Sequence, residues 1–299
     1  MPLTIWEGSA YAPTALVTDV LETHCSYRKW MSPMFYSPEP TGRIEPSDFI
    51  SYVLSRRGLE ALSLGLRDTV LLTFIPELER RLLKRLGSPA PHPQPIQRQS
   101  WYNPDGHAFS AIASPMGAPM AVMLLEQLIA IGARRFLYLG FCGALNPSYQ
   151  IGDCFVPTTG VREEGTSYHY LPAHVIPAAS AQANALLHAQ AAAQGVMVRS
   201  GAIWTTDALY RETASKISQF QEAGIHAVDM EMAALFAVAH YRACDVAALL
   251  VVSDECYHPT WQPGFGHARM RQGCRDAVDL CIRAADQLAA APAPLGGYA

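Results

Sequence analysis

The segment FLYLGFCGALNP, residues 136–147, decides how the rest of the chain is interpreted. An apolar run rich in aromatic side chains leads into a Gly-x-x-Gly loop that contains Gly140 and Gly143. Such a loop lets backbone N–H groups close on an anion. Tyr138 and Phe141 nevertheless place large rings where an anion site needs charged and hydroxyl groups. The segment therefore either binds phosphate or has been rebuilt for another use.

The composition is that of a globular protein with a large apolar core. The chain has 299 residues, of which 50% are hydrophobic and 16% are charged. A net charge of -4 gives no basic surface for nucleic acid or for an anionic membrane. We therefore expect a small-molecule partner, no nucleic acid and no membrane.

The N-terminal segment and the cysteines both indicate a cytoplasmic protein. Residues 1–13 lack the basic stretch and the apolar run of a secretory signal. The apolar stretches 120–131 and 245–252 are interrupted by Glu126 or are too short to span a bilayer. Because the 7 cysteines include no Cys-x-x-Cys pair, reduced thiols are favoured over disulfides or a metal, and we expect no cofactor.

Strands and helices alternate along the chain from residue 68 onward. Strands are predicted at 68–75, 108–113, 136–140, 153–157, 198–204 and 246–254. Helices are predicted at 76–87, 117–131, 178–194, 212–223, 231–241 and 267–290. Several of the strands are apolar throughout, which is typical of a largely parallel sheet covered on both faces. The sequence therefore predicts an α/β fold.

The chain divides into three parts. Residues 1–66 are irregular, with one predicted helix at 46–64, and we interpret them as an extension that packs on the core or on a neighbouring subunit. Residues 67–290 are predicted to form the main domain. Residues 291–299, APAPLGGYA, are expected to be a disordered tail.

Four separated segments match one family in order and spacing. They are GFCGALNPSYQIGD at 140–153, VREEGTSYHYLP at 161–172, AVDMEMAALFAVA at 227–239 and VVSDE at 251–255. Together they resemble the uridine and purine nucleoside phosphorylase and nucleosidase superfamily. The resemblance implies a catalytic domain with a three-layer α/β/α sandwich and a central mixed sheet, assembled as a homo-oligomer such as a dimer or hexamer. It also implies cleavage of the bond between a ribose and a base through an oxocarbenium-like sugar.

The resemblance assigns to Glu231 the role of binding the ribose hydroxyls. A carboxylate accepts hydrogen bonds from both hydroxyls of a vicinal diol, and its hold strengthens as positive charge grows on the ring. Glu231 in the sequence DMEM lies where the family keeps its ribose glutamate, with Met230 against the sugar face. The alternative is that this carboxylate only complements the dipole of the helix that follows.

The resemblance assigns to Asp254 the role of the acid that assists the departing base. A purine leaves easily only when a ring nitrogen is protonated or hydrogen-bonded as the bond breaks, which a partly neutral carboxylic acid provides. Asp254, at the end of the strand 246–254, matches the family's purine-side acid. The alternative is an ordinary turn cap. Because pyrimidine-specific relatives do not keep this aspartate, the resemblance implies a purine-type base.

The segment TTDALYRET, residues 205–213, matches the part of the family that lines the base pocket. Tyr210 is expected to supply an aromatic ring there, and Leu209 occupies the position of the family's stacking Phe. Arg211 and Glu212 either contact the base or pair on the surface.

The family's side-chain ligands for phosphate are missing from this chain. Its phosphorylases use Gly-Asp-Pro-x-Arg after the first strand, with an Arg and a Ser or Thr that bracket the Gly-x-x-Gly loop. Here the first motif reads FIPEL at 74–78, and Tyr138 and Phe141 occupy the other two positions. A dianion against these groups loses hydration without gaining charge-assisted bonds, at a cost of at least several kcal/mol.

Water is therefore the expected nucleophile. Relatives that use water, of the methylthioadenosine nucleosidase type, keep a glutamate near the first helix. Glu77 and Glu79 lie within about one helical turn of that position, although either glutamate alternatively only complements the helix dipole. Phe141 and Gly143 are expected to line the substrate site.

The leading hypothesis is a hydrolase of purine-type nucleosides, with Asp254, Glu231 and Glu77 as catalytic residues. One alternative is a phosphorylase whose phosphate contacts come from elsewhere, such as the arginines at 43, 56 and 57. Another is a noncatalytic nucleoside-binding protein. A third is that Tyr138 and Phe141 face an unusual 5′ group of the substrate.

Overall fold

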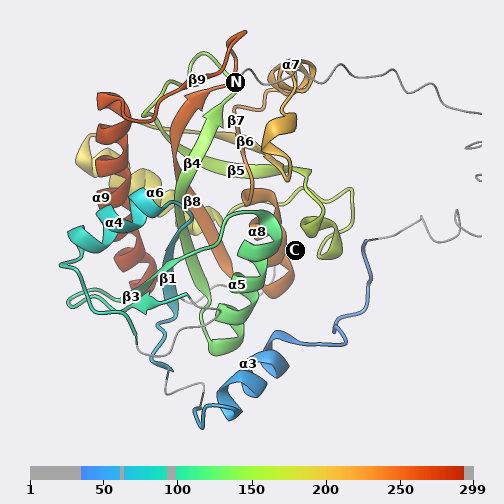
Figure 1. The fold of residues 1–299 in the computed structure, drawn as a ribbon, viewed down its shortest axis with the longest axis vertical. Coiled ribbons are helices and arrows are strands. Elements are labelled where there is room, and N and C mark those ends of the chain that lie inside the picture. The colour runs from blue at the N-terminus through green and yellow to red at the C-terminus, as the bar shows by residue number, and fades with distance from the viewer. Residues whose placement is uncertain (1–34, 61–63, 93–98, 293–299) are drawn as a thin grey trace, which may run out of the picture.

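The computed structural model describes residues 35–60, 64–92 and 99–292, and all structural statements refer to these residues. They form a nine-stranded mixed sheet with helices on both faces (Figure 1). The strands are β1 Thr69–Thr73, β2 Trp101–Tyr102, β3 Phe109–Ala113, β4 Arg135–Ala144, β5 Cys154–Glu163, β6 Val198–Thr206, β7 Ala227–Asp229, β8 Asp245–Glu255 and β9 Gln262–Pro263.

The helices of the described residues comprise both α-helices and short 3-10 turns. The α-helices are α3 Pro46–Ser55, α4 Pro76–Arg85, α5 Ala118–Ile131, α6 Ala181–Gln194, α7 Ala214–Glu222, α8 Met232–Arg242 and α9 Ala268–Ala290. The 3-10 turns are η2 Thr166–His169 and η3 Leu209–Arg211.

The strand order is β2-β3-β1-β4-β7-β6-β5-β8-β9, with an additional pairing between β4 and β8. The β1, β3, β4 and β8 strands run parallel, as do β5, β6 and β7. The two groups meet in antiparallel pairs between β4 and β7 and between β5 and β8. Because β4 also pairs with β8, the strands β4, β7, β6, β5 and β8 close into a ring.

Successive side chains along the central strands point to opposite faces of the sheet and so belong to two different apolar cores. Leu72 and Tyr138 belong to the core beneath α5 and α8, whereas Leu71, Leu137 and Leu139 belong to the core beneath α4, α6 and α9. Figure 1 shows these two groups of helices on opposite sides of the sheet. The predicted three-layer α/β/α sandwich is therefore confirmed, and burial on both faces explains why the strands are apolar throughout.

The extension contributes to one of these cores. Ile50 and Leu54 of α3 are buried together with residues of α5, and Tyr241 of α8 donates a hydrogen bond to the Pro40 carbonyl at 2.9 Å. The α3 helix ends at Ser55 rather than continuing to residue 64, since Gly58 adopts φ 64 and turns the chain. The domain division at residue 66 stays a prediction, and most of the predicted tail lies outside the described residues.

The Gly-x-x-Gly segment is a strand, so its prediction as a loop was wrong. β4 continues through Gly140 and Gly143 to Ala144 because β8 pairs with it over this whole length. Glycine is required there by close packing rather than by a turn. A Cβ on Gly140 would lie 3.2 Å from the Phe74 ring, and one on Gly143 would lie 2.8 Å from Cys256 Sγ.

Candidate active site

The predicted ribose and base residues both lie near the point where β4 changes neighbours. β4 pairs with β1 as far as Leu139 and with β7 from Gly143 onward. In α/β sheets, ligands bind at the carboxyl ends of strands where the neighbours change. Asp254 pairs with Gly143 across β8 and β4, and Glu231 begins α8 just after β7. Both predicted carboxylates therefore lie at this end of the sheet.

Glu231 is buried and held in a fixed orientation. The residue is only 6% exposed, and its Oε1 accepts a hydrogen bond from the Gly117 backbone N–H at 2.7 Å. Gly117 adopts φ 90 at the start of α5, which brings that N–H to the carboxylate. Burial and the charge of Asp229 raise the pKa of Glu231. The free site therefore favours a proton on this carboxyl, and donors from a ligand would favour its ionised form.

Asp229 holds the start of α8 and was not identified from the sequence. Its carboxylate accepts from the Thr205 hydroxyl at 2.6 Å and from the backbone N–H groups of Glu231 at 3.0 Å and Met232 at 2.7 Å. The Thr205 Oγ1 in turn accepts from Ala233 N at 2.9 Å. Burial raises the pKa of Asp229 although these hydrogen bonds lower it. An acidic residue directly before an apolar helix is the signal that indicates such a cap.

Asp254 is surrounded by donors. Its Oδ2 accepts from Trp261 Nε1 at 2.8 Å and from Cys256 Sγ at 3.3 Å. Its Oδ1 accepts from the Ser253 hydroxyl at 2.6 Å. None of these three donors was predicted. Trp261 lies beyond β8 in a loop, seven residues after Asp254, and no local pattern links the two side chains. A Cβ on Gly143 would approach Asp254 Oδ2 to 3.3 Å, so the absence of a side chain there leaves room for this network.

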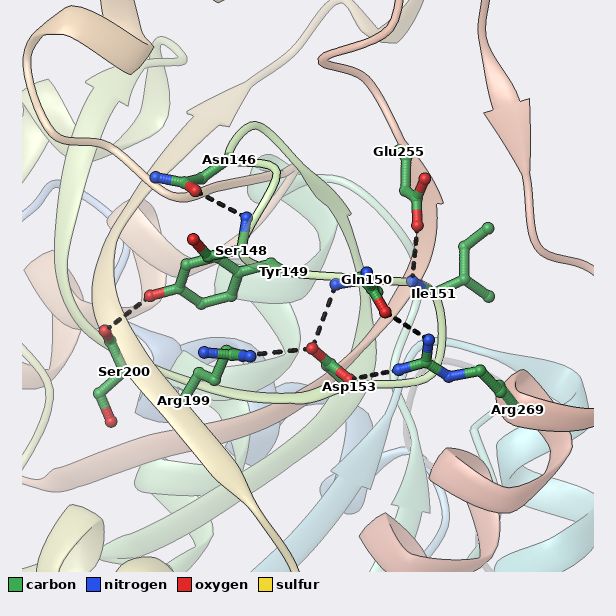
Figure 2. Close-up of polar contacts among 10 residues, drawn as sticks. All are labelled: Asn146, Ser148, Tyr149, Gln150, Ile151, Asp153, Arg199, Ser200, Glu255 and Arg269. Carbon is green, nitrogen blue, oxygen red and sulfur yellow. Dashed lines mark hydrogen bonds and ion pairs between the residues drawn. The ribbon is translucent and has the colours of Figure 1, made fainter.

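The connection between β4 and β5 braces the end of β8 (Figure 2). Asp153 accepts from the Gln150 backbone N–H and from Arg199, at 3.1 and 3.2 Å, and pairs with Arg269 of α9 at 3.1 Å. The Ile151 N–H donates to Glu255 Oε1 at 3.1 Å, one residue after Asp254. The sequence segment NPSYQIGD is thus a structural support for the site.

Glu212 is half-buried. Burial, followed by the charges of Asp254 and Glu163, raises its pKa to about 7. The sequence left open whether Glu212 contacts the base or pairs on the surface, and its contact with a base stays a prediction.

Three other predicted base-pocket residues are on the surface. Tyr210 is 96% exposed and Leu209 is 48% exposed, and Arg211 is also exposed. All three belong to η3, a single 3-10 turn that contributes no buried residue to the core. The structure does not bring them against Glu231 or Asp254, and their contact with a substrate stays a prediction. Met230, between Asp229 and Glu231, is half-buried.

Glu77 is not brought together with the other two predicted catalytic residues. It lies in α4, which packs against α9 in the layer opposite to α8. Arg81 Nε contacts its carboxylate at 2.7 Å, and Arg80 also pairs with it. Although burial acts to raise the pKa of Glu77, these two arginines lower it. A carboxylate so paired is a poor base, which argues against the predicted activation of water.

Aromatic and aliphatic side chains stand at the positions that the resemblance gives to the family's phosphate ligands. Phe74 and Tyr138 stack with their centroids 5.2 Å apart and an interplanar angle of 11°. Tyr138 and Leu78 are fully buried, and the Phe141 ring lies 6.4 Å from that of Phe265. No guanidinium occupies any of these positions.

Comparison with known proteins identifies the family. A model described as the phosphorylase superfamily matches residues 88–288. The chain belongs to the phosphorylase superfamily. The resemblance stated from the sequence is therefore confirmed. Relatives of the chain include proteins named guanosine phosphorylase, uridine phosphorylase and purine nucleoside phosphorylase.

Two curated superfamily members show the extent of the similarity. The guanosine phosphorylase of Halorubrum lacusprofundi is 27% identical over 179 residues, which cover 60% of this chain and 74% of that protein. The uridine phosphorylase of Haemophilus influenzae is 26% identical over 231 residues, covering 71% and 89% respectively. N-glycosidic bond cleavage is thus the chemistry of the named relatives.

Solved structures of superfamily members share the fold. A purine nucleoside phosphorylase from Toxoplasma gondii in complex with immucillin-H has a TM-score of 0.69 and 20% identity, covering 75% of this chain and 92% of that one. A uridine phosphorylase from Vibrio fischeri has a TM-score of 0.67 and 21% identity, covering 78% and 98%.

Within the described ranges, no group of three or more His, Cys, Asp or Glu side chains could hold a metal ion. None of the helices described there is both long and apolar enough to cross a bilayer.

Proposed function

We propose that this member of the phosphorylase superfamily hydrolyses the N-glycosidic bond of a purine-type nucleoside, with water as the nucleophile. The observation that supports the proposal is the stack of Phe74 on Tyr138. By the resemblance, Tyr138 stands at the position of an arginine of the phosphate site and Phe74 at that of the first Gly of the Gly-Asp-Pro-x-Arg motif, whose Arg position is Leu78. A phosphate dianion there would lose its hydration without meeting a guanidinium. Water requires no such charge.

Glu231 holds the ribose in this proposal. The Gly117 N–H occupies one lone pair of Oε1, and the Met230 N–H also donates to this carboxylate. A carboxylate has about four lone-pair sites, so two are left for two ribose hydroxyls. When both ribose hydroxyls donate to Glu231, they stabilise its negative charge, so the bound sugar favours the ionised form of this carboxyl. That negative charge stabilises the oxocarbenium-like sugar as the bond breaks.

Asp254 marks the end of the site that receives the base. Asp254 pairs with Gly143 across β8 and β4. Its match to the purine-side acid of the family supports a purine-type base, since the resemblance implies that pyrimidine-specific relatives lack this aspartate. We further propose that the protein acts as a homo-oligomer in the cytoplasm, without a cofactor.

Phosphorolysis is the second candidate function. It is favoured by the names of the relatives, which include a guanosine phosphorylase and uridine phosphorylases. In that case phosphate contacts come from outside the aromatic stack, for instance from exposed Arg43 or Arg56 in the extension of a neighbouring subunit.

A nucleoside panel, assayed with and without phosphate, separates these functions. We expect free ribose as the sugar product and a rate independent of phosphate. Ribose 1-phosphate, formed only when phosphate is present, would establish phosphorolysis instead. Failure to cleave any nucleoside, combined with measurable nucleoside binding, would favour the noncatalytic alternative. Glu231→Ala prepared in parallel controls for contaminating host enzymes, since it should lose the activity.

A further inference from the structure

Trp261 is an exposed residue whose one polar side-chain group is directed at the candidate active site. The residue is 61% exposed, and its indole N–H donates to Asp254 Oδ2 at 2.8 Å. A surface indole can donate to water, so this bond is not needed to satisfy the Trp261 side chain. The bond instead places a fixed donor beside the carboxyl that the resemblance assigns to the departing base.

The loop that carries Trp261 is held by its backbone. The β9 strand, directly after Trp261, pairs with the end of β8. The Gly264 N–H then donates to the Ser253 carbonyl at 2.7 Å. A Cβ on Gly264 would lie 2.7 Å from that carbonyl oxygen, so glycine permits this close approach. Because none of these contacts involves the indole, a change of the Trp261 side chain should leave the loop in place.

The two carboxyl oxygens of Asp254 have different neighbours. Oδ2 faces two donors, the Trp261 N–H, which cannot accept, and the Cys256 thiol at 3.3 Å. Burial raises the pKa of this thiol, so it keeps its proton at neutral pH. Oδ1 lies 2.6 Å from the Ser253 hydroxyl, which both donates and accepts and is also 3.2 Å from the Cys142 carbonyl. An acid proton on Asp254 therefore fits on Oδ1 rather than on Oδ2.

A purine presents N7 and the group on C6 along one edge of the base. N7 is an acceptor, whereas the group on C6 is an acceptor in a 6-oxopurine and a donor in a 6-aminopurine. A carboxylic acid with two unoccupied oxygens suits a 6-aminopurine, because its O–H donates to N7 and its other oxygen accepts from the amino group. Here Oδ2 is engaged by two donors, so the second contact is lost. The indole N–H is a donor that suits an oxo group instead.

We propose that Trp261 is a specificity-determining residue whose N–H donates to the oxygen on C6 and selects a 6-oxopurine nucleoside over a 6-aminopurine nucleoside. The inference rests on the proposed cleavage of a purine-type nucleoside and names the class of its base. Asp254 keeps its role as the acid, with Oδ1 donating to N7, while the Trp261 N–H is shared between Oδ2 and the base oxygen. An amino group at the same place would meet donors and leave an N–H without a partner.

Three ribonucleosides that differ around C6 test the inference. Inosine carries the oxo group, adenosine carries the amino group, and purine riboside, with hydrogen there, is the reference. Wild type should prefer inosine to adenosine by at least about tenfold in kcat/KM. Trp261→Phe keeps a ring and removes the N–H, so it should reduce this preference by about tenfold. Relative to purine riboside, inosine should lose a hydrogen bond and adenosine should gain access to Oδ2.

Gln262→Ala is the matched control in the same loop. The Gln262 side chain is exposed and donates to the carbonyl and the hydroxyl of Thr260, both at 3.2 Å. The variant removes a side-chain N–H donor that does not contact Asp254, so the preference for inosine should stay as in wild type.

Binding of the free bases gives a second readout that needs no turnover. In isothermal titration calorimetry, wild type should bind hypoxanthine about tenfold more tightly than adenine. Trp261→Phe should bind the two bases about equally. Circular dichroism of each variant confirms that the fold is intact.

The results separate failure of the inference from failure of the proposed function. If wild type cleaves adenosine as well as inosine, or if Trp261→Phe leaves the preference unchanged, Trp261 does not select the base although the proposed function stands. If no purine nucleoside is cleaved, the proposed function fails and base binding decides the inference. A preference for hypoxanthine that Trp261→Phe removes would then support it, and equal or absent binding of the two bases would overturn it.

Discussion

Replacing Glu231 with Gln tests the ribose site while preserving its shape. The amide oxygen can still accept the Gly117 N–H, which lies 2.7 Å from Oε1. The substitution therefore removes charge from the contacts to the ribose hydroxyls and leaves the packing of α8 in place. A hydrogen bond to a charged group contributes about 1.5–3 kcal/mol and one to a neutral group about 0.5–1.5 kcal/mol, so two weakened bonds give a loss of about 2–3 kcal/mol. We expect kcat/KM to fall by about one and a half to two powers of ten.

The assay uses a ribonucleoside and its 2′-deoxy analogue with both enzymes. Wild type should discriminate strongly against the deoxy substrate, because one of the two hydroxyls is missing. Glu231→Gln should discriminate much less, since the interaction that the hydroxyl makes has been weakened. A loss of less than tenfold in kcat/KM, or an unchanged preference for the ribonucleoside, would refute the assignment of Glu231 to the ribose.

Three further predictions follow from the packing of the site. Because burial raises the pKa of Glu231 in the folded state, its contribution to stability is present at low pH and is lost as pH rises, so the Tm of Glu231→Gln relative to wild type should increase from acid to mildly alkaline pH. Gly143→Ala would place a Cβ 2.8 Å from Cys256 Sγ and should lower kcat by about 100-fold through displacement of Asp254, whereas Gly165→Ala, where a Cβ meets nothing closer than 4.0 Å, should leave kcat unchanged. Tyr138→Arg would bury a guanidinium against Phe74 and should lower the Tm by about 6–12 °C, as expected for a loss of about 3 kcal/mol, without creating phosphorolysis; a stable, phosphate-dependent variant would contradict this.

The sequence was sufficient to predict the layers and the location of the two main carboxylates. Apolar strands alternating with helices indicate a covered sheet, and short motifs place Glu231 after β7 and Asp254 at the end of β8. Local patterns of this kind predict the elements of the folded protein because the hydrophobic face of each element must be buried. They do not show which polar groups will meet, and Thr205 reaches Asp229 only because β6 and β7 are paired.

Errors in prediction occurred where distant contacts override local preferences. Gly140 and Gly143 indicate a loop by propensity, but pairing with β8 keeps them in a strand. Glu77 was expected beside the attacking water, but its carboxylate pairs with Arg80 and Arg81 of its own helix, three and four residues further on. The protonation of Glu212 depends on acidic neighbours from three strands, which no local pattern reveals.

The identity of the sugar product in the presence of phosphate tests the central claim most directly. The purified protein is incubated with a purine nucleoside and excess phosphate, and the products are followed by phosphorus NMR. Because Tyr138 and Leu78 stand at the positions of the two arginines of the family's phosphate site, the account predicts free ribose, no ribose 1-phosphate signal, and the same rate when phosphate is omitted. A ribose 1-phosphate signal that grows in step with the released base would contradict it.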